Sequence, residues 1–419
     1  MLNPESLIHD WNGERPPSPA AVRCPALNDE TLRDGLQSPS AIDPGPDLKL
    51  RLLHLMAELG IGAVTLGYPA AGPRMLAQTR LLASEIARAR LPLAGNCAAR
   101  TLEADLAPIA AVQAETGVAL EAAAFIGTSG VRMAAEGWTL GGMVGALERA
   151  VRFAVGQGLA VMFVAEDASR AAPATLRTLG RAAVQCGARR ICLADTAGSA
   201  TPEGVRRLVQ FVREEVVAPS PEPVGIDWHG HRDRGLALAN CLAAIDAGAD
   251  RVHATALGTG ERAGNAEMEL LLANLGLRGC TYGDLTRLPE YCITAARAMG
   301  VAIPANHPVV GGDAFRTASG VHAAAVLKAL GRGDDALADA LYSSLPAREF
   351  GLAQRIAISP MSGKSNVRHW LAMHGYDAGD SALIAALLAA AKAADHALAD
   401  AECEAAVQRV LGARDAAPA

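Results

Sequence analysis

The chain has 419 residues, of which 51% are hydrophobic and 20% charged, and its formal net charge is −6. This length predicts one large domain with smaller additions, and the hydrophobic share is ample for a sizeable core. The chain has no long basic run, which argues against a nucleic-acid partner or an anionic membrane surface, because both require clustered Lys and Arg.

The sequence also predicts a cytoplasmic protein. Its longest apolar stretch, residues 382–391, is about half of the roughly 20 residues that a membrane span needs. Residues 1–22 contain no basic segment followed by an apolar one, so we expect no signal peptide. The eight cysteines show no C-x-x-C pairing. In such a chain we expect them to be reduced and mostly buried thiols.

From residue 24 onward, short apolar or β-branched runs alternate with stretches of helical periodicity. The predicted strands cover residues 24–28, 63–67, 91–95, 120–125, 160–165, 190–194, 224–228 and 251–256. Eight strand–helix pairs in about 250 residues favour a (β/α)8 barrel over an open α/β sheet. Strict alternation is missing from the strands, as is typical of parallel strands buried on both faces.

After residue 279 the strand–helix alternation stops. The pattern predicts helices over 285–299, 321–330 and 381–411, with a loop at 361–366. The predicted fold class is therefore α/β, a TIM barrel followed by a smaller, mostly helical C-terminal region. The expected boundaries are an N-terminal arm over 1–22, the barrel over 23–279 and C-terminal subdomains over 280–419.

Active sites of such barrels lie at the C-terminal ends of the strands. His229 and His231 follow the seventh predicted strand at i and i+2, so in extended backbone both side chains face the same way. Two converging imidazoles are half of a divalent metal site, and Asp34, after the first strand, is placed to add a carboxylate. The alternative is a pair of polar residues at a strand end, satisfied by solvent or by neighbouring carboxylates.

Two nitrogens and a carboxylate leave coordination positions open, and such a site polarises a carbonyl as a Lewis acid. Mixed nitrogen and oxygen donors suit Mg, Mn, Zn or Co, and the spacing does not choose among them. The glycine run 258–264 follows the last strand and lacks the G-x-G-x-x-G spacing, so it does not predict a dinucleotide site.

These segments resemble the signatures of a known family. Residues 28–39, NDETLRDGLQSP, are similar to the T-L-R-D-G-x-Q signature of the 2-isopropylmalate synthase and homocitrate synthase family. Residues 229–233, HGHRD, and 260–265, GERAGN, resemble its second signature. The family consists of metal-dependent TIM-barrel enzymes related to citramalate synthase and hydroxymethylglutaryl-CoA lyase. The resemblance extends from about residue 24 to 370.

The resemblance implies a metal site in which Asp34, His229 and His231 are ligands. Asn265 matches a further ligand or near-ligand of the family. The implied cofactor is a divalent metal ion.

The resemblance also assigns the substrate-handling residues. Arg33 matches an arginine that stabilises an oxyanion or enolate, and with Gln37 it would bind substrate. Glu166 matches a catalytic glutamate of the fifth strand. Thr196 matches a threonine that holds the carboxylate of a 2-oxo acid.

Beyond the barrel, residues 308–315, PVVGGDAF, and 319–322, SGVH, resemble the condensing enzymes rather than the lyases. His322 then matches a histidine implicated in acid–base chemistry, and Tyr342 a tyrosine of the same subdomain. In the family this subdomain reaches into the partner subunit's active site, which implies a homodimer. Without the resemblance, His322 and Tyr342 would be interpreted as an ordinary pair on a helix surface.

Three positions depart from the family pattern. Thr65 stands where a glutamate is usual, Leu257 replaces a common asparagine, and Arg232 lies inside the second signature. Arg232 either recognises a second substrate carboxylate, as in 2-oxoglutarate, or is solvated or paired structurally. Leu36 is closer to the lyases than to the synthases.

The resemblance implies a metal-dependent Claisen-type condensation of acetyl-CoA with a 2-oxo acid, which releases CoA. A reaction like that of 2-isopropylmalate synthase is favoured. The alternatives are homocitrate or citramalate synthesis, a lyase of the hydroxymethylglutaryl-CoA type, and a catalytically silent barrel that serves as a binding subunit.

Overall fold

The computed structural model describes residues 7–9, 11 and 23–415. The chain divides into two compact units, one over residues 16–302 and one that combines 303–419 with 1–15. The predicted arm, 1–22, lies almost entirely outside the described residues. The predicted boundary between 279 and 280 falls inside the first unit, because helix α10 (Leu288–Met299) packs against α1 (Pro46–Glu58). Each unit is described here by itself.

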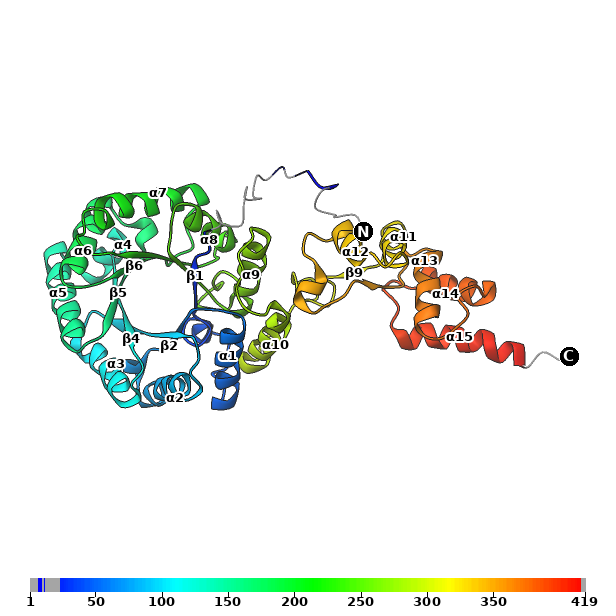
Figure 1. Ribbon diagram of the computed structural model, residues 1–419, viewed down its shortest axis with the longest axis horizontal. Helices are drawn as coiled ribbons and strands as arrows, with labels where there is room; N and C mark the ends of the chain where they lie inside the picture. Colours follow the sequence, from blue (N-terminus) through cyan, green and yellow to red (C-terminus); the bar gives the residue numbers. More distant parts are fainter. Residues whose placement is uncertain (1–6, 10, 12–22, 416–419) are drawn as a thin grey trace. The chain divides into compact units, whose positions relative to one another are not determined.

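The first unit is a closed barrel of eight parallel strands in the order β1 to β8, as predicted (Figure 1). Strand β8 returns to β1, with Ala26 opposite Arg251. The strands are β1 (Ala26–Asp29), β2 (Ala63–Gly67), β3 (Ala94–Arg100), β4 (Leu120–Gly127), β5 (Ala160–Glu166), β6 (Arg190–Asp195), β7 (Gly225–Gly230) and β8 (Arg251–Ala254).

Seven strands begin within two residues of their predicted starts, and the third does not. Strand β3 occupies 94–100 instead of 91–95, with Ala94 paired to Ala63. Its inner residues are mostly Ala, Gly and Cys, which have little β-propensity, whereas the leucines that suggested a strand precede it.

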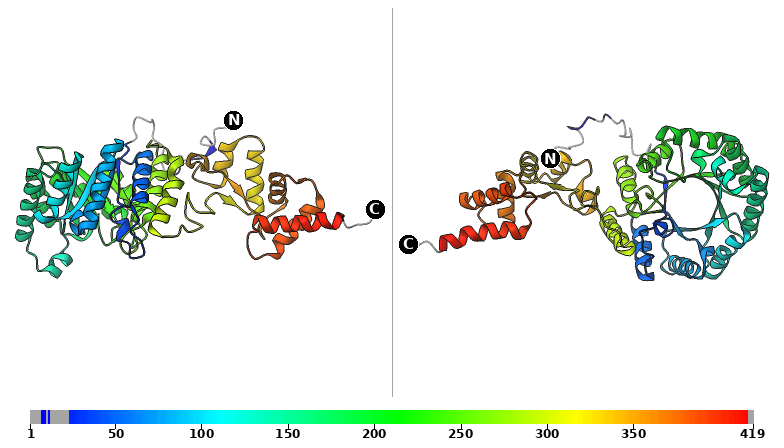
Figure 2. Two further views of the ribbon diagram at one scale, coloured as in Figure 1. Left: turned by 90° about the horizontal axis from the view of Figure 1, so that it is seen from below. Right: turned by 180° about the vertical axis from the view of Figure 1, so that it is seen from behind.

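Helices surround the barrel, as the view along it in the right-hand part of Figure 2 shows. Helix α1 begins at Pro46, and the N–H that proline lacks would have no partner within the first turn of a helix. The helix buries Leu52, Leu53 and Met56 on one face. The remaining helices of this unit are α2 (Pro73–Ala89), α3 (Glu103–Thr116), α4 (Gly130–Glu136), α5 (Leu140–Gly156), α6 (Pro173–Gln185), α7 (Pro202–Val212), α8 (Ala237–Asp246), α9 (Met268–Leu277) and α10.

Polar side chains occupy part of the barrel interior, where branched apolar residues are usual. Asn28 donates to Thr65 Oγ1 (3.1 Å), Thr65 donates to Asn96 Oδ1 (2.7 Å), and Asn96 donates back to Asn28 Oδ1 (2.7 Å). All three are buried. Thr65, one of the departures from the family pattern, therefore completes a closed ring of hydrogen bonds across β1, β2 and β3.

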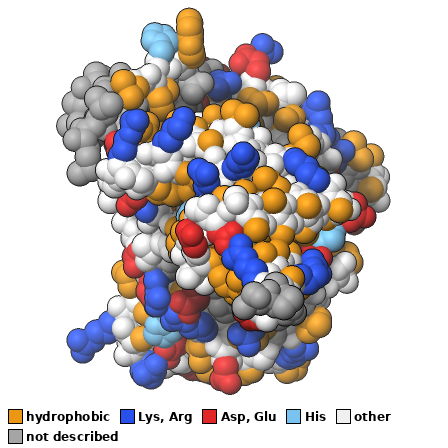
Figure 3. All heavy atoms as spheres, turned by 90° about the vertical axis from the view of Figure 1, so that its right-hand side faces the viewer, with side chains coloured by type: hydrophobic (Ala, Val, Ile, Leu, Met, Phe, Trp, Pro, Cys, Tyr) orange, Lys and Arg blue, Asp and Glu red, His pale blue; other side chains and the backbone are white. Residues whose placement is uncertain are grey.

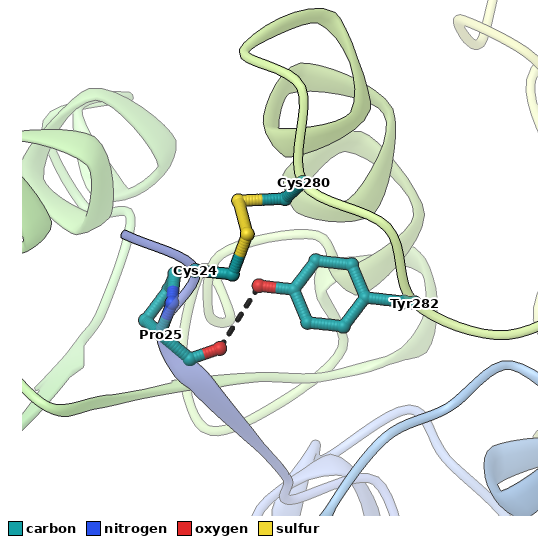
Figure 4. The surroundings of a disulfide bond; sticks show 4 residues. All are labelled: Cys24, Pro25, Cys280 and Tyr282. Carbon is teal, nitrogen blue, oxygen red and sulfur yellow. Dashed lines mark hydrogen bonds between the residues drawn. A yellow bond between two sulfur atoms is a disulfide. The ribbon is translucent and has the colours of Figure 1, made fainter. Parts of the chain in front are cut away.

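Two cysteines form a disulfide, which corrects the expectation that all eight are reduced. Cys24 precedes β1 and Cys280 follows α9, and their Cα atoms lie 5.4 Å apart (Figure 4). Closure of the barrel brings together residues separated by 256 positions, which no local spacing could reveal. Tyr282 donates to the carbonyl of Pro25 (2.9 Å) beside the bond. The other six cysteines, all in the described part of the chain, are free and buried.

The C-terminal unit is mostly helical, as predicted. It contains α11 (Gly320–Leu330), α12 (Asp335–Tyr342), α13 (Lys364–Met373), α14 (Ser381–Ala393), α15 (Asp400–Asp415) and a two-stranded sheet of β9 (Arg316–Thr317) and β10 (Arg355–Ile356). The helix predicted over 381–411 is two helices, because the chain turns after Ala393 and Leu398 bonds to the carbonyl of Ile358 (2.8 Å).

The surface drawn in Figure 3 intersperses hydrophobic side chains with arginines and lysines. Within the described residues, no helix has both the length and the apolar character that crossing a membrane requires.

Candidate active site

Three buried side chains converge at the C-terminal end of the barrel. Asp34 lies in the turn after β1, His229 lies near the end of β7, and His231 follows that strand. Asp34 Oδ2 is 3.3 Å from His229 Nε2 and 3.5 Å from His231 Nε2. The spacing i and i+2 in extended backbone places both imidazoles on the same side. The donor atoms of all three residues lie within 4.8 Å of one another, close enough for one cation.

The chemistry of these donors suits a cation. Burial lowers the pKa of His231 to about 4, so its imidazole is neutral and can offer a lone pair at neutral pH. Its Nδ1 atom is buried without a hydrogen-bond partner among the described residues. Burial alone would raise the pKa of Asp34, but Arg33 and the two histidines hold it well below its ordinary value. Two imidazoles and a carboxylate are a set that binds divalent metals.

The glycine-rich turn after β8 approaches this group through Gly260. A Cβ atom there would overlap the amide of Asn265 and lie 2.8 Å from Asp34 Oδ1. Only glycine at this position therefore leaves room for both side chains. The backbone N–H of Glu261 donates to the same Oδ1 (3.1 Å), which leaves Oδ2 facing the histidines. Asn265 is buried and donates to the carbonyl of Thr259 (3.1 Å). Its predicted role as a ligand stays a prediction.

Arg33 points into the same site. Its Nε donates to Glu30 Oε2 (2.8 Å) and its Nη1 to Gln37 Oε1 (3.2 Å), and Nη1 lies 3.5 Å from Asp34 Oδ2. These contacts hold the positively charged guanidinium of Arg33 beside the three converging donors. There it can stabilise negative charge that develops during a reaction.

A buried charge network, which the sequence did not predict, lies beneath Arg33. His253 on β8 lies between Glu30 Oε1 (3.1 Å) and Asp227 Oδ2 (2.9 Å), and Arg251 donates to Asp227 (2.6 Å). Burial opposes a charge on His253, but the hydrogen bonds to both carboxylates raise its pKa above the ordinary value. The pattern that could have revealed the network is the alternation 227 and 229 on β7, continued by 231 just after it, and 251 and 253 on β8, which turns all five inward.

Asp34, His229 and His231 line a cavity of about 400 Å³ at the barrel mouth, together with Glu30, Arg33 and His253. Seven of the predicted site residues line it: Arg33, Asp34, Gln37, Glu166, Thr196, His229 and His231. Burial raises the pKa of Glu166, which keeps its carboxyl group protonated to higher pH than usual. The hydroxyl of Thr196 accepts from the backbone N–H of Asp167 (2.8 Å), and its own proton remains available for a ligand.

His322 and Tyr342 lie in the C-terminal unit. Their rings stack with centroids 4.1 Å apart, and both side chains are exposed. They are not among the residues that line the barrel cavity. Their catalytic roles stay predictions.

Of the two remaining departures from the family pattern, the structure explains Arg232 and does not explain Leu257. Arg232 donates to Glu267 Oε1 (2.6 Å) and to the carbonyl of Ala263 (2.6 Å), so it is paired structurally. Leu257 is buried with a left-handed backbone (φ +57°), a conformation in which Asn is common and Leu rare. Its N–H donates to Glu269 Oε2 (3.0 Å).

Comparison with known proteins agrees with this architecture. The sequence model of a family described as HMGL-like matches residues 25–292, which covers the whole barrel. The chain belongs to the HMGL-like family. Among solved structures, the HMG-CoA lyase of Bacillus subtilis has a TM-score of 0.56 at 19% identity, covering 68% of this chain and 96% of that one. This likeness supports the HMGL-like fold alone.

Curated relatives of the chain carry synthase names. Homocitrate synthase AksA of Methanopyrus kandleri is 34% identical over 350 residues, 81% of this chain and 80% of that protein. A putative (R)-citramalate synthase of the same organism is 33% identical, covering 92% and 72%. The 2-isopropylmalate synthase of Halalkalibacterium halodurans is 31% identical, covering 72% of this chain and 58% of that protein. The chain is therefore related to synthases of the type that its motifs resemble.

Proposed function

We propose that the protein catalyses a metal-dependent condensation of acetyl-CoA with a 2-oxo acid and releases CoA, in the manner of a 2-isopropylmalate synthase. The observation that carries this proposal is the group Asp34, His229 and His231 beside the guanidinium of Arg33 in one cavity. Relatives named as three such synthases support the same reaction class.

Asp34, His229 and His231 are the residues that would hold the cation, with Asn265 adjacent. A divalent cation there supplies Lewis-acid polarisation of a carbonyl group. Thr196 orients the acceptor by donating its hydroxyl proton to a carboxylate. Arg33 stabilises the negative charge of an enolate or alkoxide, as a preorganised donor does most effectively in a site sheltered from water.

Proton transfer is the second task of the site, because the methyl group of acetyl-CoA is a weak acid. Glu166, with its raised pKa and its position in the cavity, is a candidate for holding or moving that proton. His322, with Tyr342, is the second candidate, contributed by the partner subunit of a homodimer as the resemblance implies. Holding donor and acceptor together offsets much of the barrier.

The acceptor's side chain is apolar in this proposal. Recognition of a second carboxylate, as in 2-oxoglutarate, would need a free cation. Arg232, the residue considered for that task, is engaged by Glu267. This favours acceptors with an apolar side chain over 2-oxoglutarate.

The test is thiol release from acetyl-CoA with a panel of 2-oxo acids, measured with Mg²⁺ or Mn²⁺ and with EDTA. We expect CoA release that needs a 2-oxo acid and stops with the chelator. If no acid in the panel releases CoA from metal-loaded protein, the condensation is wrong. Cleavage of hydroxymethylglutaryl-CoA, assayed in parallel, would then identify a lyase, and inactivity in both assays would identify a silent barrel.

A further inference from the structure

The barrel topology fixes the direction in which a bound acceptor extends. Asp34, His229 and His231 lie at the ends of β1 and β7, on either side of β8. In a closed barrel of eight strands, β3 and β4 lie opposite β7 and β8. A 2-oxo acid whose carbonyl and carboxylate oxygens are held at the ends of β1 and β7 therefore directs its side chain across the barrel mouth toward β3 and β4.

A second cavity, of about 550 Å³, opens at the ends of β3 and β4. It adjoins the first cavity, because Phe125, Arg132 and Glu166 line both. Its walls come from the turn after β3, the end of β4, the short helix α4 and the first half of α5. Apolar side chains dominate them, namely Leu102, Phe125, Ile126, Trp138, Met143 and Ala146.

Arg132 lines both cavities. Its Nε lies 3.6 Å from Glu166 Oε1, its Nη1 lies 3.1 Å from Glu136 Oε1, and its guanidinium carbon lies 5.7 Å from the centre of the Trp138 ring. A Cβ atom at Gly127 would overlap the aliphatic stem of Arg132, so the glycine makes room for this position.

The charges of the second cavity are internally balanced. Arg132 is paired with two glutamates, and Arg100 is paired with Asp105 through two hydrogen bonds (2.8 and 2.9 Å). The phosphates of CoA would require cations that are not already neutralised. The apolar walls and balanced charges therefore suit an uncharged, apolar group.

We propose that the second cavity binds the side chain of the acceptor, and that the substrate class is a 2-oxo acid with a side chain bulkier than isopropyl, such as an arylalkyl or long aliphatic chain. Turnover of such an acid rests on the proposed condensation, whereas binding of the acid in the cavity does not. Phe125 lines both cavities and therefore lies where the side chain would enter, whereas Ile126, Trp138, Met143 and Ala146 line the second cavity alone.

The experiment narrows the cavity with Ala146→Phe. Turnover is measured with pyruvate, 2-oxoisovalerate, 2-oxooctanoate and 2-oxo-4-phenylbutanoate. The ratio of kcat/KM for 2-oxo-4-phenylbutanoate to kcat/KM for pyruvate is then compared between the wild type and the variant. We expect a ratio above roughly 10 for the wild type, because each methylene in an apolar pocket changes selectivity by about 10-fold or more. Ala146→Phe should reduce this ratio at least about 10-fold. Ala135→Phe, on the exposed side of α4, is the matched control with an unchanged ratio.

Binding is measured separately, without acetyl-CoA, by titrating 2-oxo-4-phenylbutanoate and following tryptophan fluorescence. We expect a change that Trp138→Phe abolishes and that Ala146→Phe shifts to higher concentration. Ala146→Leu provides a milder variant if the phenylalanine prevents folding, as judged by circular dichroism.

The outcomes separate the two proposals. Binding of the bulky acid at Trp138 without CoA release from any acceptor would refute the condensation and leave the cavity assignment standing. CoA release with the small acids alone, and an unchanged ratio in Ala146→Phe, would overturn the cavity assignment. An increase in the KM for acetyl-CoA in place of a changed ratio would assign the cavity to the donor and also overturn it.

Discussion

His231 differs from an ordinary buried histidine in two respects. Its Nδ1 has no hydrogen-bond partner among the described residues, and burial lowers its pKa to about 4. A neutral ring in this state, 3.5 Å from the carboxylate of Asp34, is prepared to bind a cation.

We therefore expect His231→Ala to remove the bound metal and to lower kcat by at least about 100-fold, since loss of an electrostatic stabiliser in a sheltered site costs 10²–10³ in rate. Metal content is measured by plasma mass spectrometry after dialysis, and kcat by thiol release. His396→Ala, at an exposed position of the C-terminal unit, is the control and should retain both. Full metal content together with full turnover in His231→Ala would refute the site.

For single residues, the sequence predicted which side chains form the site better than it predicted their hydrogen-bond partners. The signatures predicted that Asp34, His229 and His231 lie together, and the structure places them within one cation's reach. Arg232 was left with two interpretations, and its hydrogen bond to Glu267 favours the structural one. Glu267 lies 35 positions later, directly before α9, so the pairing depends on the path of the chain between β7 and α9.

At the scale of elements, the inward faces of β7 and β8 carry charges that are usually absent from a barrel interior. His253 lies between Glu30 and Asp227, and Glu30 in turn bonds to Arg33. The strands thus connect the barrel interior to the site through one continuous set of ion pairs.

The raised pKa of His253 makes stability depend on pH. The imidazole is charged in the folded protein over a pH range in which it is neutral in the unfolded chain. Its contribution to stability is therefore complete below about pH 6.5, the ordinary value for His, and is lost as pH rises through the folded pKa.

We expect the wild type to lose stability as pH increases above about 6.5, and His253→Gln to show a weaker dependence in this interval. Removal of one partner from a buried ion network should also lower the free energy of unfolding by about 3–5 kcal/mol near pH 6.5. Urea unfolding at pH 6, 7, 8 and 9 measures both effects. Parallel pH profiles for the two proteins would contradict the charged state of His253.

The elements themselves were largely predictable, and the exceptions have physical causes. Barrel strands with β-branched residues were placed correctly, whereas β3, built from small residues, was misplaced. The break between α14 and α15 was missed because its residues, mostly Ala with Asp and His, favour helix as readily as a turn. Arg132 was not singled out, because its position depends on α4 and on the space at Gly127.

For the whole molecule, the disulfide is the feature that the sequence did not reveal. Cys24 and Cys280 join the start of the barrel to the segment between α9 and α10, across 256 positions. Such a bond stabilises mainly by restricting the unfolded chain.

We expect Cys24→Ser combined with Cys280→Ser to lower the free energy of unfolding by about 2–4 kcal/mol. Turnover should be retained, since neither cysteine lines the barrel cavity. Urea unfolding with and without dithiothreitol is the measurement. The reductant should destabilise the wild type and have no effect on the double variant, and a wild type indifferent to it would argue against the bond.

The same bond makes the barrel a covalent ring. All eight barrel strands lie on the loop that the two cysteines close, since β1 begins after Cys24 and β8 ends before Cys280. A single protease cut in any loop between them opens the ring without releasing a fragment. On a denaturing gel, a nicked barrel would keep its mass until a reductant separates the two pieces, so the polypeptide can be broken once and still remain one molecule.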